Sequence, residues 1–279
     1  MENNKVWFIT GASKGLGLEL AKKLLKEGYK VAATSRSEDA LVKVLGEASE
    51  NFLPLEMDLV DEKSVKNAIE VAISYFKTID VLVNNAGYGL LGALEELTDA
   101  ESRKNYEVNV FGLLNVIRNT VPYMRANGSG YIFNISSVGG YSGNFPGWGI
   151  YCSTKFAVAG LTESLAAEVK PFGINATIVY PGYFRTDFLK DSSLLLPQNP
   201  IADYKEVRQS ESAHKDDINQ NQPGDPVKLA EALIKMSHEK NPALHLFLGQ
   251  DAYDMANLKI ESVQKDLENW KAVSVSTGF

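Results

Sequence analysis

The sequence predicts one α/β domain, in which a doubly wound parallel sheet of about seven strands is covered by helices on both faces. Short apolar runs alternate with longer helical patterns from the first residues onward. These runs lack the in–out alternation of a strand with one wet face, so they are expected to be buried on both sides. Right-handed crossovers between them would build a parallel sheet, and such sheets bind ligands beyond the carboxyl ends of their strands.

The predicted elements follow one another without a linker, repeat or low-complexity tract, so residues 1–279 are expected to form a single domain. Strands are expected at 6–10, 30–35, 52–56, 81–84, 131–135, 175–180 and 244–248. Helices are expected at 15–28, 41–48, 61–76, 100–127, 151–172 and 226–237.

Two segments differ in character from this alternation. Residues 188–225 are rich in Asp, Ser, Asn, Gln and Pro, and they contain the apolar patch Leu194-Leu195-Leu196. A long irregular segment inside a compact domain is usually a functional lid or a mobile loop, so this segment is predicted to cover a substrate. Residues 250–279 are predicted to form a C-terminal helical extension. Its apolar side is expected to comprise Met255, Leu258, Val263, Leu267 and Trp270.

Composition and charge exclude several classes of protein. The apolar fraction of 44% is typical of a globular protein, and the net charge of −7 without a long Lys/Arg run argues against nucleic acid or anionic membrane as the main partner. Cys152 is the one cysteine, so an intramolecular disulfide is impossible. The chain begins without room for a signal peptide and has no stretch of roughly 20 apolar residues, so a cytoplasmic location is expected. No metal site is expected, because the histidines are scattered without metal-ligand spacing: His214, His238 and His245.

A glycine-rich turn follows the first expected strand and opens the first helix. Gly11, Gly15 and Gly17 let the backbone turn sharply and approach a pyrophosphate, while the helix N-terminus offers free N–H groups. The spacing Gly-x-x-x-Gly-x-Gly differs from the general dinucleotide fingerprint. The strand before it and the helix after it nevertheless favour a nucleotide cradle over a plain turn.

The end of the second expected strand indicates which nicotinamide nucleotide is bound. NAD-binding proteins place an Asp or Glu there, whereas this strand ends in Thr34-Ser35-Arg36. Arg36 can bind a ribose 2′-phosphate with two hydrogen bonds, and Lys14 in the glycine turn is expected near the same phosphate. We therefore predict NADP(H) rather than NAD(H). The alternative is that both side chains are ordinary solvated cations.

Tyr151 and Lys155 are four residues apart, so they lie on one face of an expected helix. A free tyrosine has a pKa near ~10 and is a reluctant acid at neutral pH. Lowering that pKa by about three units requires about 4 kcal/mol. One ammonium roughly 4 Å away, at an effective dielectric of about 20, supplies a comparable energy. Lys155 is therefore predicted to make Tyr151 a proton donor, although such a pair alone is more often an ordinary feature of a helix surface.

The glycine turn, the Tyr151/Lys155 pair and several further motifs make the chain resemble the short-chain dehydrogenase/reductase family, which has a Rossmann-type fold. The family's motifs appear in order over roughly the first 190 residues: Thr10 to Gly17, Asp58, Asn84-Asn85-Ala86-Gly87, Asn109, Ser137, Tyr151-x-x-x-Lys155, Pro181-Gly182 and Thr186. The resemblance implies a catalytic tetrad of Asn109, Ser137, Tyr151 and Lys155. In that tetrad Ser137 would hold the substrate oxygen toward Tyr151, the general acid/base, and Asn109 would hold a water that relays protons toward Lys155.

The resemblance also implies how the nucleotide is held. Asp58 and Asn85 match positions that flank the adenine, and Thr186 matches the contact to the nicotinamide carboxamide. The cofactor-binding residues are expected to be Gly11, Ser13, Lys14, Gly15, Leu16, Gly17, Ser35, Arg36, Asp58, Leu59, Asn85, Ala86, Gly87, Tyr151, Lys155, Pro181, Gly182 and Thr186.

One departure from the family pattern concerns the serine. Ser137 precedes Tyr151 by fourteen residues, one more than is usual. The extra residue is assigned to the loop 142–145, where Asn144 is expected to influence specificity. The departure leaves Ser136 as an alternative, but the Val-Gly-Gly that follows Ser137 favours Ser137.

The sequence thus predicts an NADP(H)-dependent oxidoreductase that interconverts a carbonyl group and an alcohol. Phe145, Trp148, Tyr183 and Phe188 are expected to wall a pocket for an apolar or aromatic small molecule, or else to belong to the core or a subunit interface. A homodimer or homotetramer is expected through the long helices at 100–127 and 151–172. Alternatives are an NADP(H)-binding redox sensor without turnover, an NAD-dependent dehydrogenase of the same family, and a nucleotide-sugar epimerase or dehydratase. The last usually has a longer chain and a Gly-x-x-Gly-x-x-Gly turn.

Overall fold

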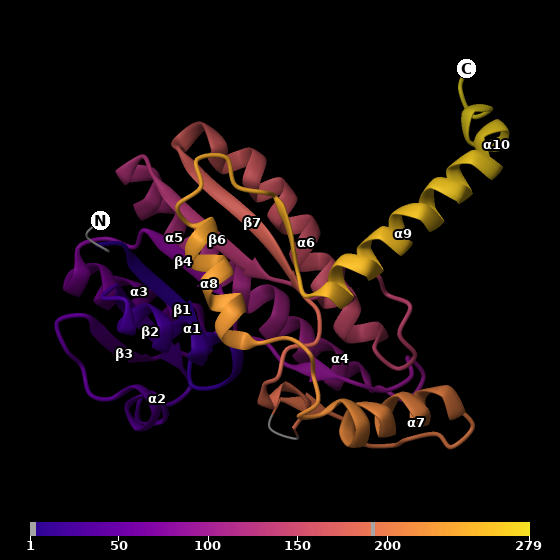
Figure 1. The fold of residues 1–279 in the computed structure, drawn as a ribbon, viewed down its shortest axis with the longest axis horizontal. Coiled ribbons are helices and arrows are strands. Elements are labelled where there is room, and N and C mark those ends of the chain that lie inside the picture. Colours follow the sequence, from indigo (N-terminus) through magenta and orange to yellow (C-terminus); the bar gives the residue numbers. More distant parts are fainter. Residues whose placement is uncertain (1–3, 191–192) are drawn as a thin grey trace.

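A computed structural model of the chain describes residues 4–190 and 193–279. Two short stretches lie outside the described residues: residues 1–3, where a signal peptide would begin, and residues 191–192, inside the predicted lid. The main sheet is parallel, seven-stranded and ordered β3-β2-β1-β4-β6-β7-β9 (Figure 1). Its strands are β1 (Val6–Thr10), β2 (Lys30–Ser35), β3 (Phe52–Glu56), β4 (Val81–Asn84), β6 (Gly130–Ile135), β7 (Ile174–Pro181) and β9 (His245–Leu248). The predicted doubly wound sheet is confirmed, and its strands lie within one residue of the predicted bounds at each end.

Helices cover both faces of this sheet, as Figure 1 shows. The α-helices are α1 (Gly15–Lys26), α2 (Glu38–Leu45), α3 (Glu62–Phe76), α4 (Asp99–Tyr106), α5 (Leu113–Asn127), α6 (Gly149–Val169), α7 (Lys205–Ser212), α8 (Pro226–Met236), α9 (Gln250–Asn269) and α10 (Lys271–Val275). Shorter turns are η1 (Glu107–Gly112), η2 (Val138–Gly140), η3 (Lys170–Phe172), η4 (Asp187–Leu189) and η5 (Ala213–Ile218). A small second sheet pairs β5 (Gly89–Leu90) with β8 (Leu194–Leu195).

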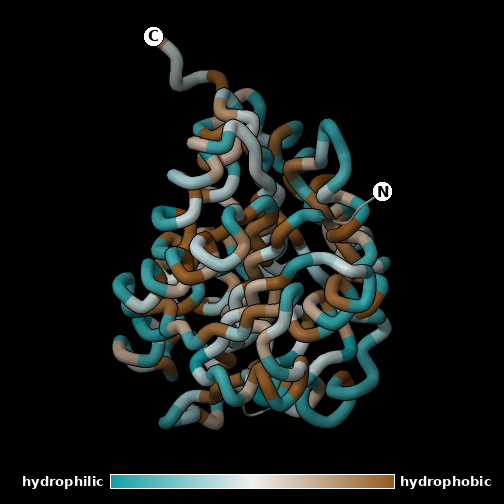
Figure 2. The backbone as a smooth tube through the Cα atoms, turned by 90° about the vertical axis from the view of Figure 1, so that its left-hand side faces the viewer, coloured by the Kyte–Doolittle hydropathy of each residue, from teal (hydrophilic) through white to brown (hydrophobic). Residues whose placement is uncertain are grey.

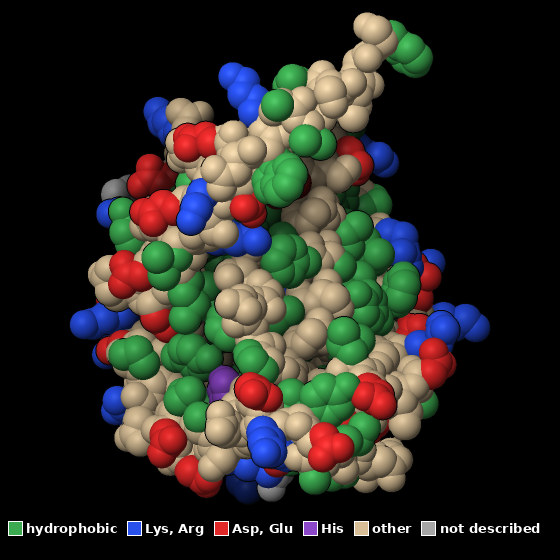
Figure 3. Space-filling model, turned by 90° about the vertical axis from the view of Figure 1, so that its right-hand side faces the viewer, with side chains coloured by type: hydrophobic (Ala, Val, Ile, Leu, Met, Phe, Trp, Pro, Cys, Tyr) green, Lys and Arg blue, Asp and Glu red, His purple; other side chains and the backbone are tan. Residues whose placement is uncertain are grey.

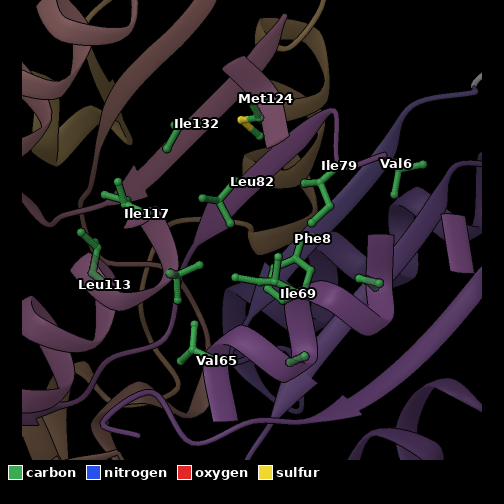
Figure 4. Packing of buried hydrophobic residues seen from close by; sticks show 14 of the residues in the cluster. Val6, Phe8, Val65, Ile69, Ile79, Leu82, Leu113, Ile117, Met124 and Ile132 are labelled. Carbon is green, nitrogen blue, oxygen red and sulfur yellow. The ribbon is translucent and has the colours of Figure 1, made fainter. Parts of the chain in front are cut away.

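The core lies on both sides of the sheet because successive strand residues point to opposite faces. In β1, Phe8 joins one hydrophobic cluster with Ile69 of α3 and Ile117 of α5 (Figure 4). Its neighbour Trp7 joins the other cluster with Leu20 of α1. Apolar residues therefore fill the interior of the molecule and polar residues its periphery, as the tube in Figure 2 shows.

Several predicted helix bounds are wrong, for local reasons. The helix expected at 41–48 begins three residues earlier, because Ser37 caps it by accepting a hydrogen bond from the N–H of Ala40 at 3.3 Å. It ends at Leu45 because Gly46 follows with a φ of 93°. The helix expected at 100–127 is interrupted by the π-helical turn η1.

The segment 188–225 is more ordered than its composition predicts. It contains α7 and the π-helical turn η5, and its strand β8 pairs with β5. Only Val207 of α7 is buried, so the helix carries no apolar stripe that could have been read from the sequence.

The chain ends in α9 and α10, which project away from the sheet and its covering helices (Figures 1 and 3). At the base of α9, Ala252 and Ala256 are buried, whereas most of the remaining extension is exposed. The predicted helix is present, but its predicted apolar side is wrong. With 100° per residue, Met255 and Leu258 fall away from the side that carries Val263, Leu267 and Trp270. None of the helices in the described parts of the chain is long and apolar enough to cross a bilayer.

Candidate functional site

A cavity of about 540 Å³ lies beyond the carboxyl ends of the central strands. The residues that follow β1, β4, β6 and β7 all line it, and they are represented by Gly11, Asn85, Ser136 and Gly182. In a parallel sheet this is the edge where ligands bind. Side chains from α6 and from the segment after β7 enclose its other end.

The glycine turn forms one wall of the cavity, and the structure shows why glycine is required there. Gly11 has a φ of 67°, and a β-carbon on it would lie 2.8 Å from the Cα of Ala86. A β-carbon on Gly17 would lie 2.5 Å from the amide nitrogen of Asn85 and 2.7 Å from the carbonyl oxygen of Gly11. Gly15, with a φ of 60°, begins α1 beside the cavity. The turn therefore fits a pyrophosphate, which would meet backbone and a helix N-terminus without an intervening side chain.

Asn85 braces this turn. Its Nδ2 donates to the carbonyl oxygens of Thr10 at 2.9 Å and Gly11 at 3.0 Å. In return the hydroxyl of Thr10 accepts from the backbone N–H groups of Asn85 and Ala86, each at 3.0 Å. The side-chain amide expected beside the adenine thus holds the loops after β1 and β4 together.

Two cations lie together at the far end of the cavity. Lys14 and Arg36 both line it, next to Ser35, Asp58 and Leu59. Burial lowers the pKa of Lys14, the nearby Arg36 lowers it further, and Asp187 opposes both effects. The effect of Arg36 on Lys14 indicates that the two cations lie close to each other, so a bound anion would relieve their repulsion. The residues present therefore fit a phosphate at this position.

Tyr151 and Lys155 project from α6 into the middle of the cavity. Both side chains are buried, and the ammonium nitrogen of Lys155 lies 5.8 Å from the centre of the Tyr151 ring. Lys155 Nζ also donates to the carbonyl oxygen of Ile135, at the end of β6, at 2.9 Å. The four-residue spacing therefore brings the phenol and the ammonium into the same part of the cavity.

The pKa of Tyr151 departs from the expectation that the ammonium dominates it. Burial raises the pKa of Tyr151, and a hydrogen bond from Ser137 opposes that effect without cancelling it. Burial also lowers the pKa of Lys155 to about 8. The reason is desolvation: removing water from a phenolate costs more than the hydrogen bond from Ser137 returns.

The two candidate serines have different surroundings. Ser136 donates to the carbonyl oxygen of Lys155 at 2.8 Å, so its hydroxyl holds β6 to α6. Ser137 lines the cavity, and its Oγ accepts from the N–H of Gly139 at 3.1 Å while the hydroxyl hydrogen-bonds to Tyr151. Of the two hydroxyls, that of Ser137 is the one placed beside Tyr151.

Asn109 lies in the π-helical turn η1, and such turns recur at functional sites. It is buried, its Nδ2 donates to the carbonyl oxygen of Tyr88 at 3.0 Å, and its Oδ1 accepts from the Tyr88 N–H at 3.1 Å. A β-carbon on Gly87 would lie 3.0 Å from Asn109 Oδ1 and 3.5 Å from Lys155 Nζ. Because Gly87 lacks a β-carbon, Asn109 Oδ1 and Lys155 Nζ can both lie close to its backbone.

The aromatic residues predicted to bind substrate gather around Tyr151. Phe145, Trp148, Tyr183 and Phe188 all line the cavity. The Tyr151 ring lies 5.4 Å from that of Trp148 and 5.8 Å from that of Phe188, measured between centroids. Of the leucine patch, Leu195 also lines the cavity, whereas Leu194 is buried in β8. This end of the cavity therefore has an apolar, aromatic surface.

His214 also lines the cavity, and sequence reasoning missed it. Its Nδ1 lies 2.6 Å from the carbonyl oxygen of Ser210, so Nδ1 carries the proton and Nε2 accepts from the hydroxyl of Tyr183 at 3.0 Å. Burial lowers the pKa of His214, which favours this neutral form. The positions of the three histidines in the sequence do not predict that η5 places His214 at the substrate end of the cavity.

Other chemistry-bearing groups do not converge here. Within residues 4–190 and 193–279, no cluster of three or more His, Cys, Asp or Glu side chains could hold a metal ion. Cys152 is buried, and burial raises its pKa to about 11, so the thiol is poorly suited to act as a nucleophile.

Known proteins resemble this chain over nearly its whole length. The chain is 34% identical over 280 residues to oxidoreductase BOA17 of Botryotinia fuckeliana. The alignment covers 98% of this chain and 99% of BOA17. It is 37% identical over 250 residues to the 3-ketodihydrosphingosine reductase of Bacteroides thetaiotaomicron, with 88% of each chain covered. A crystal structure of a short-chain dehydrogenase from Streptomyces avermitilis superposes with a TM-score of 0.89 at 35% identity and covers 98% of this chain and 100% of that one.

Two similar structures contain a nicotinamide nucleotide, and they differ in which one. The 3-ketoacyl-(acyl-carrier-protein) reductase of Brucella melitensis, complexed with NADH, has a TM-score of 0.74 at 27% identity and covers 89% of this chain and 98% of its own. ElxO with NADP bound has a TM-score of 0.71 at 30% identity and covers 88% and 96%. The model of the short chain dehydrogenase family matches residues 5–194. The chain therefore belongs to the short-chain dehydrogenase/reductase family of oxidoreductases.

Proposed function

We propose that the protein is an NADP(H)-dependent oxidoreductase that interconverts a carbonyl group, ketone or aldehyde, and an alcohol on an apolar or aromatic small molecule. The observation that carries this proposal is the convergence of Tyr151, Ser137 and Lys155 in the cavity that also contains the glycine turn. A binding protein without turnover needs the turn but has no use for a buried ammonium behind a phenol.

The nucleotide would lie along the cavity from Arg36 to Tyr151. The glycine turn would hold the pyrophosphate, Lys14 and Arg36 the 2′-phosphate, and the segment from Pro181 to Thr186 the nicotinamide end. When bound as NADPH, it would supply a hydride to the carbonyl carbon. NADP(H) is favoured over NAD(H) because β2 ends in Ser35, followed directly by Arg36, rather than in a carboxylate and because Lys14 lies close to Arg36.

The chain's own residues would manage the proton. Ser137 and Tyr151 donate hydrogen bonds to the substrate oxygen, and Tyr151 then gives its proton to that oxygen. Lys155, with a pKa of about 8, remains largely protonated at neutral pH and stabilises the phenolate left behind. Asn109 lies on the same side of Gly87 as Lys155, and it would hold a water that relays a proton toward Lys155. In the oxidative direction each of these transfers runs backward.

The substrate class follows from the aromatic wall around Tyr151, which suits an apolar or aromatic group better than a charged sugar. Two relatives carry names that denote ketone reduction, a 3-ketodihydrosphingosine reductase and a 3-ketoacyl-(acyl-carrier-protein) reductase. Those names support a ketone as the reacting group here.

We also propose a cytoplasmic homo-oligomer. Phe111 on η1 is 49% exposed and Phe156 on α6 is 42% exposed. Exposed aromatic side chains on these helices would suit a contact between copies. The acidic chain with its lone cysteine is compatible with a reducing compartment.

The test measures NADPH oxidation with a panel of apolar ketones and aldehydes, and the reaction is monitored by both the absorbance and the fluorescence of NADPH. Tyr151→Phe should lower kcat/KM by about 10²- to 10⁴-fold, because the phenol supplies the proton. The Kd for NADPH, titrated by nucleotide fluorescence, should stay near the wild-type value. Tyr75→Phe is the matched control, since Tyr75 is exposed on α3 and should leave both quantities unchanged.

Two results would contradict the proposal. Wild-type turnover by Tyr151→Phe would exclude the acid role of the phenol. Tight NADPH binding by the wild-type protein without reduction of any carbonyl in a broad panel would favour the redox-sensing alternative.

A further inference from the structure

The substrate end of the cavity contains a hydrogen-bonded pair, Tyr183 and His214, whose direction the structure fixes. His214 Nδ1 lies 2.6 Å from the carbonyl oxygen of Ser210, and a carbonyl oxygen can only accept, so Nδ1 carries the imidazole proton. In the neutral ring Nε2 is then an acceptor, and the hydroxyl of Tyr183, at 3.0 Å, donates to it. The single proton of that hydroxyl is therefore already used inside the protein.

Several contacts hold this pair in place. The His214 side chain is buried, and its ring lies 4.9 Å from that of Trp148, measured between centroids. The backbone N–H of Tyr183 donates to the carboxylate of Asp251 at 2.6 Å. Burial raises the pKa of Tyr183, and Asp251 raises it further, so the phenol keeps its proton. The pair therefore has a fixed orientation at the wall of the cavity.

The pair lies in the same cavity as the tyrosine of the proposed reaction. Tyr183 and His214 line the cavity that contains Tyr151, and Tyr183 is half-buried there. The ring of Trp148 contacts both sides, at 5.4 Å from that of Tyr151 and 4.9 Å from that of His214. Burial is the main cause of the raised pKa of Tyr151, and Tyr183 adds to that rise, as expected for two phenols near each other. A small molecule bound beside Tyr151 would therefore also meet Tyr183.

The two tyrosines offer opposite hydrogen-bonding character to a ligand. In the proposed reaction Tyr151 donates its proton to the substrate oxygen. The hydroxyl of Tyr183 already donates to His214, so only the lone pairs of its oxygen remain, and these accept. A ligand acceptor could take the Tyr183 proton only by leaving the buried Nε2 of His214 without a partner, which is unfavourable. A ligand donor, in contrast, adds a hydrogen bond and breaks none.

We propose that Tyr183, positioned by His214, is a specificity-determining residue that selects ketones with a hydrogen-bond donor near the reacting carbonyl, namely hydroxyketones. This inference rests on the proposed function and narrows its substrate class. The substrate hydroxyl donates to Tyr183 Oη while the carbonyl oxygen accepts from Tyr151. The two polar groups cannot exchange places, because a carbonyl oxygen finds no donor at Tyr183. The apolar wall that includes Trp148 and Phe188 receives the remaining carbon chain.

The experiment compares aliphatic ketones in pairs matched for size, with NADPH as the reductant. In the first pair a hydroxyl or a methyl group occupies the same carbon, one, two or three bonds from the carbonyl. In the second pair a methoxy or an ethyl group occupies that carbon. At the best position, the wild-type kcat/KM should be about 5- to 30-fold higher for the hydroxyl compound than for the methyl compound. The methoxy compound, which can only accept, should gain no advantage over the ethyl compound.

Two variants separate the roles of the partners. Tyr183→Phe removes the accepting oxygen, so the hydroxyl-to-methyl ratio should fall by about 5- to 30-fold. His214→Phe frees the Tyr183 proton for a ligand, so the methoxy-to-ethyl ratio should rise by about 3- to 10-fold. Tyr253→Phe changes an exposed tyrosine on α9, and as the matched control it should leave both ratios unchanged. Circular dichroism confirms that each variant is folded.

Equal losses for the hydroxyl and methyl compounds in Tyr183→Phe would overturn the proposal, because a purely structural role of the pair affects both compounds alike. A wild-type ratio near one at every hydroxyl position would overturn it as well. The same compounds are titrated by calorimetry into the protein with NADP⁺ bound, so that recognition is measured without turnover. A preference in binding without reduction of any ketone would reject the proposed function alone, whereas turnover without the preference would reject this inference alone.

Discussion

The two ends of the cavity are built in different ways. At the nucleotide end, the structure depends on close approach of the backbone: Gly11 and Gly17 lie against the loop after β4, and Asn85 holds that loop to the turn. At the substrate end, side chains from several elements form the wall. Tyr151 of α6 lies beside Phe188 of η4, and Tyr183 meets His214 of η5.

This difference between the two ends indicates where the protein can accept amino-acid substitutions. A turn that depends on absent β-carbons tolerates almost no substitution, because any side chain meets backbone. A wall assembled from α6, η4 and η5 can change one contributor at a time while the sheet stays intact. We therefore expect nucleotide binding and substrate binding to respond separately to mutation.

Among the changes that compare the two ends, the largest effect is expected at the nucleotide end. Gly17→Ala places a methyl group against Asn85 and the carbonyl of Gly11, and it should weaken NADPH binding by about 100-fold and lower the free energy of unfolding by about 1–3 kcal/mol. Fluorescence titration and urea unfolding measure the two quantities. Gly160→Ala, in α6 with no neighbour within 4 Å of the new carbon, should not weaken either. Similar behaviour of the two variants would refute the steric account of the turn.

A smaller effect should separate the two nicotinamide nucleotides. Arg36→Asp removes charged hydrogen bonds to a 2′-phosphate, so the ratio of NADPH to NADH in kcat/KM should fall by about 10- to 50-fold. Arg103→Asp changes an exposed arginine outside the cavity and serves as the control. An unchanged NADPH-to-NADH ratio in Arg36→Asp would refute the proposal that Arg36 binds the 2′-phosphate.

The smallest effect concerns pH at the substrate end. Because the pKa of His214 in the folded protein is lowered, the neutral form is favoured, and its contribution to stability is present above the ordinary histidine pKa of about 6.5. As the pH falls below that value, the unfolded chain gains the proton first, so the free energy of unfolding decreases by at most about 1.4 kcal/mol per pH unit. Protonation also ends the acceptance of the Tyr183 hydrogen bond.

We therefore expect the KM for the carbonyl substrate to rise by about 3-fold between pH 7 and pH 5.5, while the Kd for NADPH changes less. The same measurement on His214→Phe supplies the control, since the replaced ring cannot titrate. An equal rise in that variant would mean that another group is responsible.

The sequence foretold the strands and the glycine turn because both depend on local signals. An apolar run such as Val6–Thr10 can be read without knowing its neighbours, and the glycines mark the turn that follows it. The helix α7 and the contacts of His214 were not foreseeable, because α7 buries Val207 alone and its partners lie elsewhere in the chain. Likewise, the effect of burial on the pKa of Tyr151 depends on the residues that pack around the ring from distant parts of the chain and not on its spacing from Lys155.

The bond between Asp251 and the backbone of Tyr183 has a mechanical consequence. A β-carbon on Gly182 would collide with the same carboxylate, so the first turn of α9 and the peptide after β7 form a tight joint. A force on the distal end of α9 would therefore be transmitted to this peptide, which lines the cavity.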